Sequence, residues 1–273
     1  MDPASFDERY RKFLPKIQQF RLMDDTFMSL VFQNKACTEF LIRTILDDDS
    51  LVVIHVDTQN SLKNLRGRSV RLDITAHDAD GRIYNIEVQR SDTGALPERA
   101  RYNSAMLDAN AARPGEPYQQ LPETYVIFIT ENDYFHSGLP LYHVERMVRE
   151  LDRPFGDRAH ILYVNGTYRG RDKIGDLMHD FSCTDPADMY SPILAGEAAQ
   201  YKSTEKGVSR MCRIMEEMID EGRQKGREEG RREGLLDNVK RLMANGSLSL
   251  EKAMDLLGIQ GDDRQFVVEH LGK

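Results

Sequence analysis

Alternating apolar and polar residues mark several short segments in the first two thirds of the chain. Side chains along a strand repeat every two residues, whereas helical faces repeat every three to four. The expected strands cover residues 51–59, a hairpin over 71–90, a nearly all-apolar run at 125–130, and 160–164. The expected helices cover residues 5–20, 24–46, 97–112 (with Tyr102, Ala105, Met106 and Ala109 facing inward) and about 175–181. This order predicts an α/β fold in which helices flank a mixed sheet.

The hairpin carries the candidate chemistry. Its second strand places Glu87 and Gln89 on one face, and Asp73 approaches the same point from the first strand. Carboxylate and amide oxygens suit a hard divalent cation such as Mg²⁺. The pattern therefore predicts metal-assisted phosphodiester hydrolysis, in which Gln89 orients the attacking water.

The spacing Asp-x13-Glu-x-Gln gains specificity from the segments around it. These are Asp-Asp-Thr-Phe-Met-Ser-Leu-Val-Phe at 24–32, Asn-Ile-Glu-Val-Gln-Arg-Ser at 85–91, Arg-Tyr-Asn-Ser at 101–104 and Tyr-Val-Ile-Phe-Ile-Thr at 125–130. Together they resemble the PD-(D/E)XK nuclease family transposases, also called the recombination-promoting nuclease family of bacteria. The resemblance covers roughly residues 20–245.

The resemblance implies a restriction-endonuclease-like core and a metal-dependent DNA endonuclease that promotes recombination, with Mg²⁺ or Mn²⁺ as cofactor. Asp73, Glu87 and the Val88 carbonyl would bind the metal, and Gln89 stands where many relatives of the wider superfamily carry lysine. Glutamine lacks the ammonium that would stabilise developing negative charge, although it is typical of this family.

Two further positions match the family pattern but also have ordinary structural interpretations. Asp24 lies three residues before Phe27, where the family has an acidic residue; it is an additional metal ligand, a plain helix N-cap, or both. Arg101 matches a family arginine and would contact a phosphate, or it is an exposed helical arginine.

Composition limits the partners. The 273 residues carry a net charge of -8, which argues against a protein that coats nucleic acid nonspecifically. A basic stretch with Lys63, Arg66, Arg68 and Arg71 would steer DNA locally, or is a solvated loop. No apolar run approaches the length of a membrane span, so we expect a cytoplasmic protein without a membrane partner. The three cysteines fit no disulfide or zinc pattern.

Glycine recurs every fourth residue at Gly222, Gly226, Gly230 and Gly234, among charged residues. In a helix these glycines cost about 1 kcal/mol each relative to alanine, so the helix would fray alone. The segment is either an arm through which the chain forms a homo-oligomer or a flexible charged linker.

The expected domain organisation has five parts: a helical lead-in (1–23), the nuclease-like core (24–185), a connecting helical segment (186–220), the charged helical arm (221–246) and a small helical unit (247–273). The alternative to the endonuclease is a catalytically inactive module with the nuclease fold that binds nucleic acid or assembles with protein. In that case Asp73 and Glu87 would pair with Arg71 or Arg90 across strands.

Overall fold

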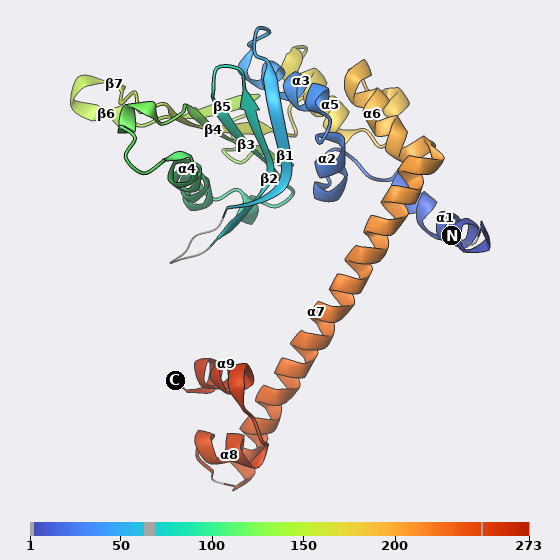
Figure 1. The fold of residues 1–273 in the computed structure, drawn as a ribbon, viewed down its shortest axis with the longest axis vertical. Helices are drawn as coiled ribbons and strands as arrows, with labels where there is room; N and C mark the ends of the chain where they lie inside the picture. Colours follow the sequence, from blue (N-terminus) through green and yellow to red (C-terminus); the bar gives the residue numbers. More distant parts are fainter. Residues whose placement is uncertain (1–2, 63–68, 247, 273) are drawn as a thin grey trace. The chain divides into compact units, whose positions relative to one another are not determined.

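The first of two compact units is built on a six-stranded mixed sheet. The structure is a computed structural model that describes residues 3–62, 69–246 and 248–272 (Figure 1). Its contacts divide the chain into Met1–Ser209 and Arg210–Lys273. In spatial order the sheet contains β1 (Val53–Leu62), β2 (Val70–Asp78), β3 (Ile83–Gln89), β4 (Thr124–Thr130), β8 (Ala159–Asn165) and β5 (Leu141–Val144).

Strand directions follow from the connections. The antiparallel pairs β1–β2 and β2–β3 are joined by short links, whereas β3, β4 and β8 run parallel and need longer crossovers. At the far edge β5 pairs antiparallel with β8, and β6 (Met147–Val148) and β7 (Arg153–Pro154) form a separate small hairpin. The expected α/β fold with a mixed sheet is confirmed.

Helices cover both faces of this sheet. The helices of this unit are α1 (Pro3–Gln18), α2 (Asp25–Val31), α3 (Lys35–Leu46), α4 (Pro97–Ala111), α5 (Lys173–Ser182) and α6 (Pro192–Ser203), of which α6 packs against α1, α2 and α3. Helix α4 lies on one side of the sheet and α3 and α5 on the other (Figure 1). The α4 side is packed by an apolar cluster that includes Leu107, Val126 and Phe128.

Two helical expectations were wrong. The helix expected at 24–46 is interrupted after Val31, because Asn34 caps a new helix by accepting a hydrogen bond from the Ala36 N–H. In α4, Ala105 and Ala109 are exposed, while Asn103 and Ser104 face the sheet. Apolar spacing failed there because the buried face of α4 is partly polar.

The second unit contains most of one long helix. Helix α7 runs unbroken from Glu205 to Gly246, so the end of the expected connecting segment and the whole of the expected arm lie in one helix. It is followed by α8 (Leu250–Leu256), which the Ser249 side chain caps, and α9 (Gly261–Leu271). A small apolar core joins the end of α7 to both, and it contains Val239, Ala253, Met254, Ile259 and Val267. Within the described ranges, no helix is both long and apolar enough to cross a membrane.

Candidate active site

The two predicted carboxylates meet where β2 and β3 separate. The strands pair from His77 and Ile83 up to Ile74 and Ile86. One residue further on, the Asp73 N–H donates to Oε1 of Glu87 at 3.3 Å, and the Val88 N–H donates to Oδ2 of Asp73 at 3.3 Å. Each carboxylate thus accepts a hydrogen bond from the opposite strand. We call this arrangement the Asp73–Glu87 fork.

Glu87 is held by a chain of polar side chains under α4. Its side chain is 0% exposed. Oε1 accepts a hydrogen bond from Nδ2 of Asn85 at 2.9 Å, and Oδ1 of Asn85 accepts one from Nδ2 of Asn103 at 3.1 Å. Burial raises the pKa of Glu87, while the hydrogen bond from Asn85 and the charge of Arg99 oppose that shift.

Asp73 is a half-buried acid next to this buried one. Burial, followed by the nearby charges of Glu87 and Asp25, raises the pKa of Asp73 to about 8. Two desolvated carboxylates repel each other when both are ionised, so a bound cation would stabilise the ionised pair. The atoms that would bind the cation are all oxygens, which fits Mg²⁺ or Mn²⁺.

Gln89 and Arg99 complete the site. Arg99, in the first turn of α4, donates from Nη2 to Oε2 of Glu87 at 2.5 Å and from Nη1 to Oε1 of Gln89 at 3.3 Å. Nη1 also donates to the Gly94 carbonyl at 3.0 Å. The sequence reasoning chose Arg101 on this helix and missed Arg99. The available signal was the position of Arg99 at the start of the helix that directly follows the strand bearing Glu87.

The acidic residues of the α2 region divide between two environments. Asp24 is the N-cap residue of α2 as expected, but its side chain makes no capping hydrogen bond. Its carboxylate instead accepts hydrogen bonds from the Arg21 N–H at 2.8 Å and from Arg90 Nη1 at 3.0 Å. Asp25 is the residue of this pair whose charge raises the pKa of Asp73. A metal-binding role for Asp24 stays a prediction.

The remaining expected residues fall in different places. Lys63, Arg66 and Arg68 lie outside the described residues. Arg101 is exposed on α4, and its contact with DNA stays a prediction, as does metal binding by the Val88 carbonyl. The alternative pairing of Glu87 with Arg90 is wrong, because Glu87 pairs with Arg99 and Arg90 pairs with Asp24 and Glu131.

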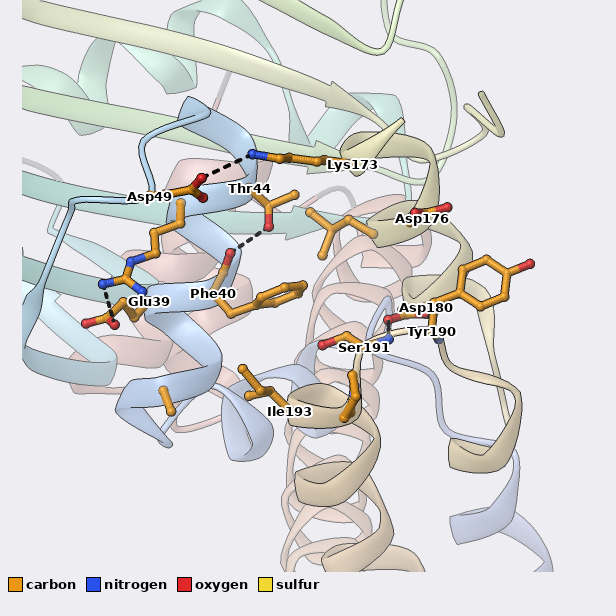
Figure 2. A pocket seen from close by; sticks show the side chains of 14 residues that line it. Glu39, Phe40, Thr44, Asp49, Lys173, Asp176, Asp180, Tyr190, Ser191 and Ile193 are labelled. Carbon is orange, nitrogen blue, oxygen red and sulfur yellow. Dashed lines mark hydrogen bonds and ion pairs between the residues drawn. The ribbon is translucent and has the colours of Figure 1, made fainter. Parts of the chain in front are cut away.

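A cavity of about 480 Å³ lies away from the fork, between α3, α5 and the start of α6 (Figure 2). Phe40, Leu177 and Ile193 give it an apolar lining, and Lys173 and Asp49 form an ion pair at its rim. None of the fork residues lines it, so the cavity and the fork are separate features of the first unit.

Asp180 borders the same cavity and also lies close to His179 and Cys183, with one potential ligand atom of each within 4.8 Å of the others. The Asp180 oxygens accept hydrogen bonds from the N–H groups of Tyr190 at 2.7 Å and Ser191 at 2.9 Å. These bonds make Asp180 an anchor for the segment that leads into α6 (Figure 2).

Comparison with known proteins places this geometry in a family. No curated protein and no solved structure matched the chain. The family model described as PD-(D/E)XK nuclease family transposase matches residues 31–166, which span β1 to β8 and include Asp73, Glu87, Gln89 and Arg99. Through residues 31–166, the chain therefore belongs to the PD-(D/E)XK nuclease family transposases.

Proposed function

We propose that the protein is a metal-dependent DNA endonuclease that hydrolyses phosphodiester bonds and promotes recombination in the manner of a transposase. Its family indicates a nuclease-like function and a DNA substrate. The observation that carries the proposal is the Asp73–Glu87 fork, where two carboxylates have raised pKa values and Arg99 contacts both Glu87 and Gln89.

In this proposal Asp73, Glu87 and the Val88 carbonyl hold Mg²⁺ or Mn²⁺, with Asp24 as an additional acidic ligand. When bound, a divalent cation neutralises charge that builds on a phosphate and makes water more acidic. Gln89 orients the attacking water through its side-chain amide, and Asn85 with Asn103 fixes the orientation of Glu87.

The test is cleavage of supercoiled and linear DNA by the purified chain with Mg²⁺, with Mn²⁺ and with chelator. Asp73→Asn and Glu87→Gln preserve side-chain size while removing a charge. Asp80→Asn is the matched control, because Asp80 lies in the exposed turn of the same hairpin. We expect metal-dependent cleavage that both site variants abolish and the control retains. Equal cleavage by all four proteins would contradict the proposal.

One observation favours a second candidate function, a nuclease-fold module that binds nucleic acid or assembles with protein without cutting. Arg99 already pairs with Oε2 of Glu87, as expected for a carboxylate that serves structure alone. If the wild type stays inert with every metal yet binds DNA or self-associates, this second function replaces the first.

We also propose that the chain forms a homo-oligomer through α7. Every residue from Asp220 to Arg231 is exposed, and a Cβ added at Gly222, Gly226, Gly230 or Gly234 would meet nothing within 4 Å. A helix with four glycines and exposed sides gains little from its own contacts, whereas a second helix can approach a glycine face closely.

Light scattering of the full chain after size exclusion tests this assembly. Gly226→Leu raises helix propensity and blocks close approach, so we expect it to lower the oligomeric state. Gln224→Leu is the control, because it lies about 160° around the helix from Gly226. A monomeric wild type, or equal behaviour of both variants, would rule out assembly through the glycine face.

A further inference from the structure

The fork contains two acids and lies next to the Gln89 amide in sequence, and β3 contributes no positively charged side chain to it. Negative charge grows on phosphate oxygens during phosphodiester hydrolysis, and preorganised cationic donors stabilise it. Gln89 can donate hydrogen bonds but carries no charge. The cation that the structure brings into contact with both Glu87 and Gln89 is the guanidinium of Arg99, which reaches them from α4.

Arg99 is held in place and still has donors available. Its contacts with Glu87, Gln89 and the Gly94 carbonyl use three N–H groups. A guanidinium has five, so its hydrogen bonds with the described residues leave two, one on Nη2 and one on Nε. The Arg99 side chain is 38% exposed, whereas Glu87 beneath it is 0% exposed. The guanidinium therefore lies between the buried acid and solvent, with N–H groups left for a ligand.

We propose that Arg99 is a catalytic residue that contacts the phosphate of DNA bound at the Asp73–Glu87 fork and supplies the positive charge that Gln89 lacks. This inference rests on the proposed nuclease function. An arginine suits the role because it stays protonated at every working pH and can bind two phosphate oxygens at once. The bond to Glu87 positions the guanidinium and keeps its charge at the site.

Three measurements on the full chain test this role. The first is DNA affinity in Ca²⁺ between about 50 and 200 mM salt, because each phosphate contact adds about 0.9 to the slope of log affinity against log salt. The second is Mn²⁺ binding without DNA, followed by electron paramagnetic resonance. The third is the single-turnover cleavage rate in Mg²⁺.

The variants are Arg99→Gln and Arg99→Lys, with Arg113→Gln as the charge-matched control. Arg113 is exposed and pairs with Glu116, beyond the end of α4. Thermal melting establishes that each variant is folded, and Arg99→Lys keeps a cation beside Glu87 if Arg99→Gln fails to fold.

We expect Arg99→Gln to reduce the salt slope by about one contact and the cleavage rate by about 10²–10³-fold, while Mn²⁺ binds at least as tightly. Arg99→Lys should keep the slope and part of the rate, and Arg113→Gln should match the wild type. If Arg99→Gln leaves the slope unchanged and loses rate only in proportion to weaker Mn²⁺ binding, Arg99 merely positions Glu87 and the proposal is overturned.

Failure of the proposed function gives a different result. A wild type that binds DNA but does not cut it, whichever metal is added, would end the nuclease proposal and, with it, a catalytic role for Arg99. The salt slope would still decide whether Arg99 contacts phosphate. A wild type that does not bind DNA overturns both.

Discussion

Nη2 of Arg99 lies 2.5 Å from Oε2 of Glu87, which joins a partly exposed cation on α4 to a fully buried acid on β3. Leaving a buried carboxylate without a partner costs free energy, so this pair couples the position of α4 to the ionisation of Glu87 on β3. Hydrogen bonds from Asn103 to Asn85 and from Asn85 to Glu87 make a second link between the same two elements.

The Asn103–Asn85 link predicts a stability effect. Asn103→Ala should lower the free energy of unfolding by about 1–3 kcal/mol, because it leaves the buried side-chain oxygen Oδ1 of Asn85 without a hydrogen-bond donor from Asn103. Urea denaturation measures the change. Asn110→Ala on the exposed part of the same helix is the control, and an equal loss for both variants would contradict the importance of the link.

The raised pKa values at the fork predict that metal binding depends on pH. Because the pKa of Asp73 is raised to about 8, a proton competes with a metal ion below that pH. Metal affinity should therefore increase from about pH 6 to pH 8 and level off above it. Calorimetry in buffers of different ionisation enthalpy measures the protons released. Binding that releases no proton at about pH 6.5 would contradict this prediction.

Gly94 leaves room for the Gln89 side chain, so a substitution there tests whether cleavage depends on the position of Gln89. A Cβ at position 94 would lie within 2 Å of Oε1 of Gln89, so Gly94→Ala should displace the Gln89 side chain. We expect cleavage to fall by roughly tenfold, with stability changed by less than about 0.5 kcal/mol, because the flexible end of Gln89 can move. Gly196→Ala in α6 has open space and serves as the control. An unchanged cleavage rate would show that Gln89 placement is unimportant.

Because Lys202 is buried, we expect the stability of the protein to depend on pH in the alkaline range. Its ammonium is buried and donates to the carbonyls of Gln18, Phe20 and Thr184; burial lowers the pKa of Lys202 to about 8 from 10.5. Between these values the unfolded chain binds more protons than the folded chain, so this group makes stability rise with pH. Lys202→Met should remove that rise, as measured by urea denaturation from about pH 7.5 to 10.

The sequence was most informative where structure depends on neighbouring residues. Alternation along the hairpin was enough to bring Asp73 next to Glu87 and to place Glu87 and Gln89 on one face of β3, where Arg99 contacts both. Arg99 and Asn103 were missed because their roles depend on which face of α4 packs on the sheet. The apolar period of that helix is weak, since polar residues occupy part of its buried face.

Other differences have similar causes. Local signals did not indicate that α3 begins afresh at Lys35, or that the exposed arm joins its neighbours in one helix from Glu205 to Gly246. Strand β5 has only four residues and is added at the sheet edge by a distant pairing with β8, which no short pattern encodes.

The order of the site along the chain has a consequence for folding. Among the described residues, those that hydrogen-bond Glu87 come from the β2–β3 hairpin or from α4, the next α-helix, so the contacts from Asp73 to Asn103 close only short loops. Short loops cost little chain entropy, whereas the pairing of β4 with β8 must close a longer crossover. The geometry of the Asp73–Glu87 fork can therefore form before the far half of the sheet is complete, and insertions between β4 and β8 would lengthen the protein without interrupting the segment that contains the fork.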